Sequence, residues 1–332
     1  MSPGSLDWGA LQIGQIKRAA QVARGRWRIA MFAWTHTAST RVPAGLAIAF
    51  NLTFIVMPLA ALAAVAGLAL DGLYRETEWA LPQVKGQDLV TLIAMPVLLV
   101  ALLAARKGSP RGTVVWLGVL GYVLYTYTGA AFSYAFNELF LVYVALFSLT
   151  SLALICAAVG LSALPLDLWV DGRVPRKGAL SFLYILAAML TLLWLGQIAP
   201  FLIDDTVPEL ITRAEVPTNF VYALDLGVIV PTALIAAYLV RRRLAWGNVL
   251  AAVLMIKAAT MGLALLSMTW FSVVAEQEVE TELSAVWVVL AAGSIAMSSW
   301  LLRHCRAARE LNSDAAAAEG ASPVGPAAGA RV

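Results

Sequence analysis

Two charged side chains lie inside long apolar stretches of the sequence: Asp225 in YALDLGVIVP and Lys257 in LMIKAATMG. Ionisable groups within a membrane are costly, so they usually occur where a ligand, an ion or another helix contacts them. The helical rise places the two backbones roughly 10 Å apart in depth. We therefore expect Asp225 to line a cavity open to the outside, and Lys257 to meet deeper polar groups such as Asn51. A lysine that only stabilises the bundle, and an aspartate hydrated at the membrane surface, remain alternatives.

Aromatic and polar side chains recur at three- and four-residue steps within residues 122–133, which would place them on one helix face. This stripe comprises Tyr122, Tyr125, Thr126, Gly129 and Ser133. Together with Trp194, Gln197, Tyr222 and Asp225, it predicts a polar pocket in the outer half of the membrane. The alternative is ordinary hydrogen bonding between packed helices. The candidate ligand-binding residues are Asp225, Lys257, Tyr122, Tyr125, Gln197, Trp194 and Asn51.

The sequence lacks the residue patterns of several common chemistries. Its two histidines, His36 and His304, lie outside the apolar segments, and its two cysteines, Cys156 and Cys305, are far apart. We therefore expect no metal site and no bound cofactor. Without an HExxH, GxSxG or GxxxxGK[ST] motif, zinc-protease, serine-hydrolase and nucleotide-hydrolase activities have no support, and no catalytic residue can be assigned. Basic residues occur as short turns rather than as a patch, so nucleic-acid binding is not expected.

The composition is that of a membrane protein. The 332 residues are 61% hydrophobic and only 13% charged, with a mean hydropathy of +0.81, whereas soluble domains carry roughly 25% charged residues. Eight apolar segments reach the length of about 20 residues that a membrane-spanning helix needs. They are Ala44–Leu70, Asp88–Ala105, Thr113–Tyr134, Glu138–Ala163, Ala179–Ile203, Asn219–Val240, Gly247–Val273 and Leu283–Leu302. The predicted fold class is all-α, a polytopic bundle of eight transmembrane helices.

The distribution of charge predicts how this bundle is oriented. The two ends of the chain and the connections after the second, fourth and sixth segments hold 19 of the 23 Lys and Arg residues. The other four connections hold only Arg75, Lys85 and Arg213 as cations, together with 13 of the 20 acids. Because cytoplasmic connections carry the excess of Lys and Arg, both termini are predicted to be cytoplasmic. The outer face is then strongly acidic.

Three regions follow from this arrangement. Residues 1–43 form a basic cytoplasmic segment, in which apolar residues recur at helical spacing between residues 10 and 28, as in a helix that lies on the membrane surface. Residues 44–303 form the transmembrane domain. Residues 304–332, rich in Ala, Gly and Pro, are predicted to be a disordered cytoplasmic tail.

A weak internal similarity suggests a parallel repeat of four plus four helices. At a constant offset, Pro96 aligns with Pro231 and Gly112 with Gly247, and the basic pair Arg106-Lys107 aligns with residues 241–242. Parallel repeats are one way in which transporters are built around a central site. The alternative is that the two matching helices merely have equal length and direction.

Several segments resemble a family of uncharacterised bacterial polytopic membrane proteins. These segments are the RKGS turn at residue 106, WLGVLGYVLYTY, FNELFLVYVALFSL, YALDLGVIVP and RRRLAWG. The resemblance implies a multi-pass protein of the bacterial inner (plasma) membrane. That family has no established activity, so the resemblance implies nothing about mechanism.

The leading functional hypothesis is a transporter or binding protein for a small solute or ion, with an outward-facing cavity among the third, fifth, sixth and seventh spans. The acidic outer face would concentrate cations there. The expected partners are membrane lipids and a small solute or cation, and no protein partner is indicated. One alternative is a membrane enzyme that acts on a lipid, with Asp225 or Glu138 as acid–base group. Another is a structural or regulatory subunit of a membrane complex.

Overall fold

The computed structural model describes residues 42–169, 176–279 and 281–305. The predicted surface helix at residues 10–28 and most of the predicted C-terminal tail lie outside these ranges. The transmembrane unit comprises Pro43–Ala307, and every regular element in its described part is a helix. The orientation of the termini and the proposed internal repeat stay predictions.

Eight helices in the described residues are long and apolar enough to cross a membrane, which confirms the predicted all-α polytopic fold. They are α2 (Ala44–Ala69), α3 (Leu81–Arg106), α4 (Pro110–Phe132), α5 (Phe140–Leu161), α6 (Arg176–Asp204), the composite α8–η2–α9 (Phe220–Arg241), α10 (Ala245–Val274) and α11 (Thr281–His304). Two short elements, η1 (Leu166–Leu168) and α7 (Glu209–Thr212), lie in the connections. The protein is thus a multi-pass membrane protein.

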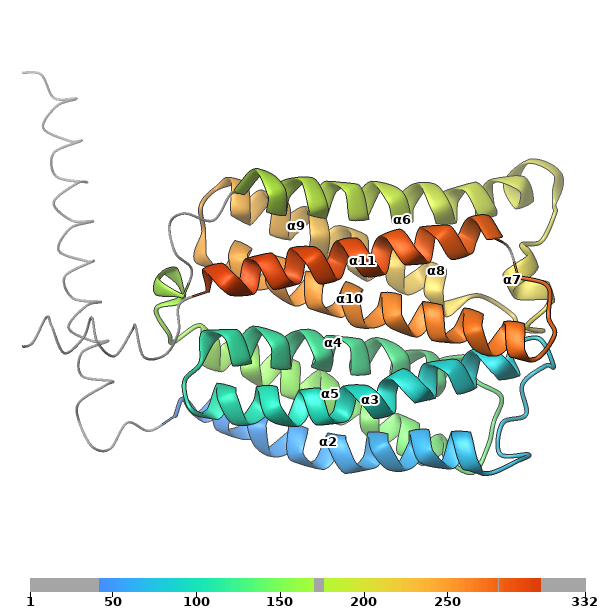
Figure 1. The fold of residues 1–332 in the computed structure, drawn as a ribbon, viewed down its shortest axis with the longest axis horizontal. Coiled ribbons are helices and arrows are strands. Elements are labelled where there is room, and N and C mark those ends of the chain that lie inside the picture. The colour runs from blue at the N-terminus through green and yellow to red at the C-terminus, as the bar shows by residue number, and fades with distance from the viewer. Residues whose placement is uncertain (1–41, 170–175, 280, 306–332) are drawn as a thin grey trace, which may run out of the picture. The chain divides into compact units, whose positions relative to one another are not determined.

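The connections rich in acidic residues meet at one end of the bundle, called the acidic end below. Three hydrogen bonds tie them together. Arg75 pairs with Glu138 at 2.7 Å, the Thr77 hydroxyl donates to the Arg213 carbonyl at 2.9 Å, and Gln277 donates to the Glu78 carbonyl at 2.6 Å. In Figure 1 this is the end near α7. The connections after α3, α5 and α9 lie at the opposite, basic end.

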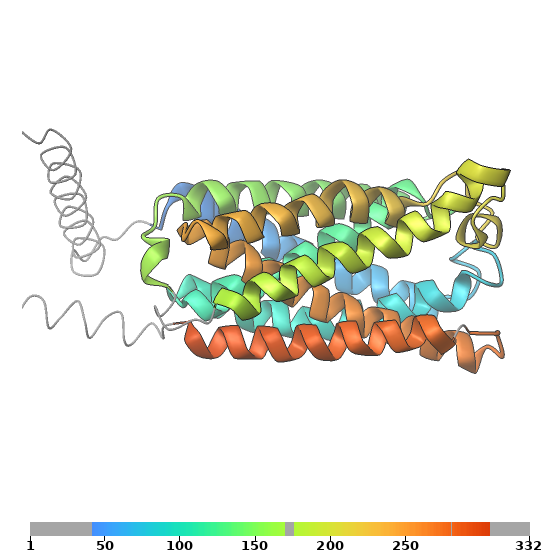
Figure 2. The ribbon, with the colours of Figure 1, turned by 90° about the horizontal axis from the view of Figure 1, so that it is seen from above.

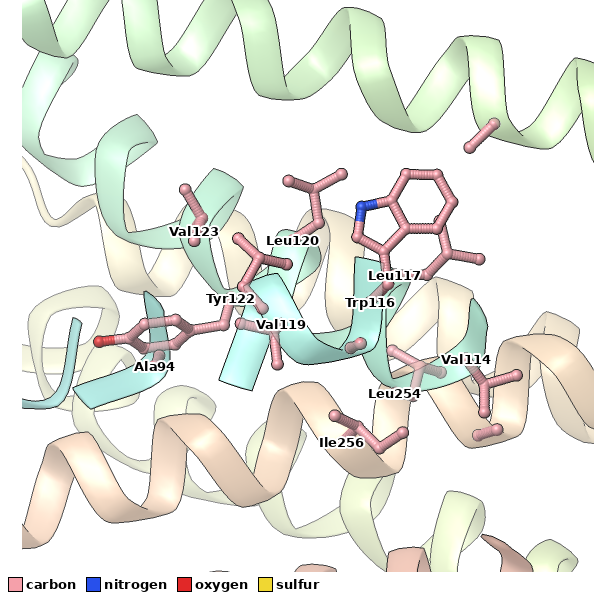
Figure 3. Close-up of a cluster of buried hydrophobic side chains, with 14 of the residues drawn as sticks. Ala94, Val114, Trp116, Leu117, Val119, Leu120, Tyr122, Val123, Leu254 and Ile256 are labelled. Atoms are coloured by element: carbon pink, nitrogen blue, oxygen red, sulfur yellow. The ribbon is translucent and has the colours of Figure 1, made fainter. Parts of the chain in front are cut away.

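The helix α10 occupies the centre of the unit, because it packs against α3, α4, α9 and α11. Figure 2 shows the helices lying lengthwise beside one another. Large side chains fill the core around α4: Ile256 of α10 packs on one side of this helix, and Trp116 and Leu120 extend from its other side, with Trp116 against Phe50 of α2 (Figure 3). The Trp116 indole donates to the Thr53 hydroxyl of α2 at 3.1 Å, so this buried polar group is satisfied within the core.

The second span begins earlier than the sequence predicts. We expected Asp88–Ala105, whereas α3 starts at Leu81 with a proline in its first turn, a position where proline is favoured. The polar residues before Asp88 are typical of an aqueous connection when only the sequence is considered. Gln87 and Asp88 are instead buried, and Asp88 Oδ2 accepts a 2.6 Å hydrogen bond from the Tyr74 hydroxyl.

The sixth span is broken into three parts around Asp225. Asn219 caps α8 (Phe220–Leu224) by accepting a hydrogen bond from the Val221 amide at 2.9 Å. The next turn, η2 (Asp225–Ile229), is a π-helix in which the Val230 amide donates to the Asp225 carbonyl. Pro231 explains the break, because it has no N–H and its ring would clash with the carbonyl four residues before it. Single π turns occur frequently at functional sites.

Candidate functional site

A cavity of about 660 Å³ lies between α3, α4, α6, α8–η2, α10 and α11. Sites for small organic ligands typically enclose about 300–1,000 Å³. Along α10 its wall runs from Leu254 to Ser272, a length of about 27 Å at the rise of an α-helix. At the acidic end it is lined by residues of the connections, including Glu76 and Glu278. The cavity is therefore elongated and reaches from the middle of the bundle to its acidic end.

The carboxylate of Asp225 forms the centre of the deep part of this cavity. Its Oδ1 accepts a 3.0 Å hydrogen bond from the Tyr125 hydroxyl, and its Oδ2 accepts a 2.8 Å hydrogen bond from Trp194 Nε1. All three side chains are buried, with Asp225 only 5% exposed. A buried carboxylate is tolerable where donors satisfy its oxygens, so Tyr125 and Trp194 hold Asp225 in a fixed position.

Lys257 lies against the ring face of Tyr125. Its Nζ is 3.7 Å from the centroid of the Tyr125 ring, a cation–π contact, and the side chain is 7% exposed. Within the described residues Nζ has neither a hydrogen bond nor an ion pair, although its charge interacts with that of Asp225. Since Lys257 lines the cavity, its N–H donors face the aromatic ring and the cavity space.

A second layer of contacts supports Trp194. The Tyr222 hydroxyl donates to Gln197 Oε1 at 2.6 Å, and the Tyr222 ring packs against Trp194 with centroids 5.1 Å apart. Gln197 and Trp194 line the cavity, whereas Tyr222 lies behind them. Tyr222 is thus a positioning residue for this wall.

Between its deep part and its acidic end, the cavity has apolar walls. Six of the residues that form them are Leu186 and Leu190 of α6, Met261 and Leu265 of α10, and Trp287 and Leu290 of α11. These side chains can exclude water from an apolar ligand but give it no hydrogen bonds. The walls therefore favour a ligand with an apolar body.

Charged residues surround the cavity where it meets the acidic end. Glu76 accepts a 2.7 Å hydrogen bond from the Ala135 amide, and Arg213 forms an ion pair with Glu209. Burial raises the pKa of Glu76 above its ordinary value, and the Ala135 N–H partly offsets this effect. Since Glu278 also lines this part, acids outnumber bases at the mouth of the cavity.

Of the predicted binding residues, five lie together at the cavity: Asp225, Lys257, Tyr125, Trp194 and Gln197. Tyr122 does not. It is fully buried in the core, where its hydroxyl is 2.9 Å from the Thr91 hydroxyl of α3. Its role is packing between helices.

The predicted meeting of Lys257 with Asn51 is wrong. Asn51 lies on the exposed side of α2, and α2 packs chiefly against α3 and α5 rather than α10. The two residues were expected to meet because their depths are similar. Depth alone does not fix the direction in which a side chain leaves its helix.

Other parts of the site were missed by the sequence analysis. Gln83 and Gln87 of α3 line the cavity, and Gln87 Nε2 donates to the Thr126 hydroxyl at 2.8 Å. Their spacing of four residues places both on one helix face, which was an available signal. The sequence does not indicate that α11 lines the cavity, because the residues that it contributes there are mostly apolar.

The described residues hold no cluster of three or more His, Cys, Asp or Glu side chains that could bind a metal ion. The deep part of the cavity instead offers one carboxylate, one ammonium and aromatic donors. Comparison with known protein families, curated proteins and solved structures finds no match for this chain. The resemblance to a bacterial membrane family stays a prediction.

Proposed function

We propose that the protein binds a small organic solute in the cavity around Asp225 and Lys257, and that this cavity is the substrate site of a transporter. The observation that carries the proposal is the position of Asp225, Tyr125 and Lys257 at the deep end of an elongated cavity inside an eight-helix membrane bundle. A cavity of this size with a cation and an anion at its deep end is more typical of a binding site than of a contact between packed helices.

The break in the sixth span supports a transport role. Discontinuous helices are a common way to form substrate sites near the middle of a transporter, because they leave backbone groups free and can bend. Here the π turn η2 begins at Asp225 itself. A change in this turn would move the carboxylate relative to its hydrogen-bond partners Tyr125 of α4 and Trp194 of α6. The irregular turn and the candidate site thus coincide at Asp225.

Binding in the cavity can be tested by filling it. Leu190 of α6 lines the cavity, whereas Leu192 is 73% exposed on the outside of the same helix. Leu190→Trp should therefore block the cavity, and Leu192→Trp is the matched control. Each variant is purified into lipid nanodiscs from its own host, and native mass spectrometry measures any bound solute.

We expect a bound solute in the wild type and in Leu192→Trp, and its loss in Leu190→Trp. Reconstitution of the wild type into liposomes then tests whether the same solute is taken up. A wild type without a bound solute, or equal occupancy in all three proteins, would contradict the proposal.

A further inference from the structure

The deep end of the cavity contains a cation whose hydrogen-bonding capacity is unused. Lys257 is more than nine-tenths buried and lines the cavity, yet in the described part of the chain its ammonium group makes no hydrogen bond. It lies against the face of the Tyr125 ring and interacts with the charge of Asp225 without an ion-pair contact. An ammonium group has three N–H donors. Leaving them unpaired in an enclosed site is costly, so a ligand that supplies acceptors gains the full benefit of pairing them.

Asp225, by contrast, is already paired. Each of its two oxygens accepts a hydrogen bond, one from Tyr125 and one from Trp194. A cationic ligand would have to compete with these donors or share the remaining lone pairs. At the deep end, the Lys257 ammonium group therefore has unsatisfied hydrogen-bond donors, whereas both oxygens of Asp225 already accept a hydrogen bond.

The shape of the cavity defines the rest of the ligand. From Lys257 the cavity follows one face of α10 through Met261 and Leu265 to Thr269, a distance of about 18 Å. Over this length the opposite walls are formed by side chains such as Leu190 and Trp287. An extended apolar chain with its head group at Lys257 would bury its length against these walls.

We propose that the ligand is an amphiphile with an apolar chain and a single anionic oxygen head group, a carboxylate or a phosphate, which binds the Lys257 ammonium. This inference rests on the proposed function, because it specifies the ligand of the same cavity. It reverses the expectation of a cationic solute, which came from the acidic outer connections alone.

The acids at the mouth do not oppose this assignment. The mouth lies about 18 Å from Lys257 along α10, so its acids do not contact a head group that is bound at Lys257. Charges at the edge of a site chiefly affect the rate of association, and buried pairs chiefly affect dissociation. Glu76 and Glu278 would therefore slow the entry of an anion without weakening its contact with Lys257.

The test compares three ligands that share one apolar chain and differ in the head group: dodecanoate, dodecanol and dodecylamine. Binding of radiolabelled dodecanoate is measured with the full-length protein in nanodiscs of zwitterionic lipid, and the unlabelled compounds compete with it. The variants are Lys257→Met, which keeps an unbranched side chain one atom shorter and without charge, and Lys257→Arg, which keeps the charge. Leu190→Trp and Leu192→Trp report whether the probe occupies the cavity.

We expect dodecanoate to compete at least about tenfold better than dodecanol, a difference of about 1.4 kcal/mol, and dodecylamine to compete least. Lys257→Met should lose this head-group preference while still binding the chain, and Lys257→Arg should retain it. Adding an anionic phospholipid to the nanodisc identifies the source of the head group. Competition by that lipid assigns the site to a membrane lipid, and its absence assigns the site to a free acid.

The two proposals fail in different ways. If dodecanol or dodecylamine competes as well as dodecanoate, or if Lys257→Met keeps the preference, the assignment of an anionic head group is wrong, although the loss of binding in Leu190→Trp would still support the cavity. If Leu190→Trp and Leu192→Trp bind equally, the probe does not occupy the cavity and both proposals are overturned. Because the wild-type series alone tests the head group, the result does not depend on whether Lys257→Met folds.

Discussion

Lys257 Nζ lies 3.7 Å from the centroid of the Tyr125 ring. This contact explains how a lysine and an aspartate at different depths can belong to one site. The hydroxyl of the same residue donates to Asp225, so a single tyrosine contacts the cation through its ring face and the anion through its hydroxyl. The charges act together without forming an ion pair, which leaves the ammonium group available to a ligand.

Tyr125→Phe tests this arrangement, because it removes the hydroxyl and keeps the ring. Asp225 Oδ1 then loses a donor in a buried position, and we expect the protein to be destabilised by about 1–3 kcal/mol. Tyr238→Phe is the matched control, because Tyr238 is 54% exposed on α9 and its loss of a hydroxyl should change stability by less than about 0.5 kcal/mol. Thermal unfolding in detergent measures both variants, and equal melting temperatures would contradict the role of the Tyr125–Asp225 bond.

Part of this site was predictable because charged and aromatic residues are conspicuous in apolar segments. Asp225 and Lys257 stand out in this way, and helical spacing added Tyr125. The same spacing also added Tyr122, which the structure places in the core rather than at the cavity. Three residues along a helix correspond to a rotation about 60° short of a full turn. That difference is enough to direct Tyr122 towards Thr91 of α3 while Tyr125 lines the cavity.

The parts that escaped prediction depend on which helices pack together. No feature of α11 marks Trp287 or Leu290 as cavity residues, because an apolar side chain is equally suited to lipid, core and cavity. From the sequence, the polar residues at the start of α3 predict an aqueous connection. In the fold, Gln87 and Asp88 are buried and bond to residues of other elements, Thr126 and Tyr74. Such partners become visible only when the fold is known.

Gly86 sets the separation of two helices that form the cavity. A Cβ atom at this position would lie 2.6 Å from the Met268 Cα and 2.7 Å from its backbone nitrogen on α10. Gly86→Ala should therefore push α3 away from α10 and destabilise the protein by about 1–3 kcal/mol. At Gly196 of α6 a Cβ would meet nothing within 4 Å, so Gly196→Ala should stabilise the helix by about 0.5–1 kcal/mol. Chemical denaturation of the two variants measures this difference, and similar stabilities would show that α3 and α10 are not in close contact.

The stability of the acidic end should depend on pH through Glu76. Burial raises the pKa of this carboxyl in the folded protein above its ordinary value of 4.5, so the folded state binds the proton more tightly than the unfolded chain does. The contribution of Glu76 to stability is therefore fully present below the ordinary pKa and is lost as the pH rises through the raised value.

Glu76→Gln removes this dependence, because the amide oxygen can still accept the Ala135 N–H and carries no charge. We expect the melting temperature of the wild type to fall relative to that of Glu76→Gln as the pH rises from acidic to neutral. Glu215→Gln, at an exposed carboxylate of the same end, reports the general effect of removing one negative charge. A difference between wild type and Glu76→Gln that stays constant with pH would contradict the prediction.

The orientation predicted from charge places the acidic end, and with it the mouth of the cavity, outside the cell. Thr218 at the acidic end and Arg242 at the basic end are both exposed, so each can be replaced by cysteine in a protein that carries Cys156→Ala and Cys305→Ala. In intact cells a membrane-impermeant maleimide should label Thr218→Cys and should not label Arg242→Cys until the membrane is permeabilised. The opposite pattern would place the cavity mouth in the cytoplasm, because all connections of one end share one side of the membrane. The cavity would then receive its ligand from the cytoplasm, and the excess of Lys and Arg at the basic end would not reflect the positive-inside rule.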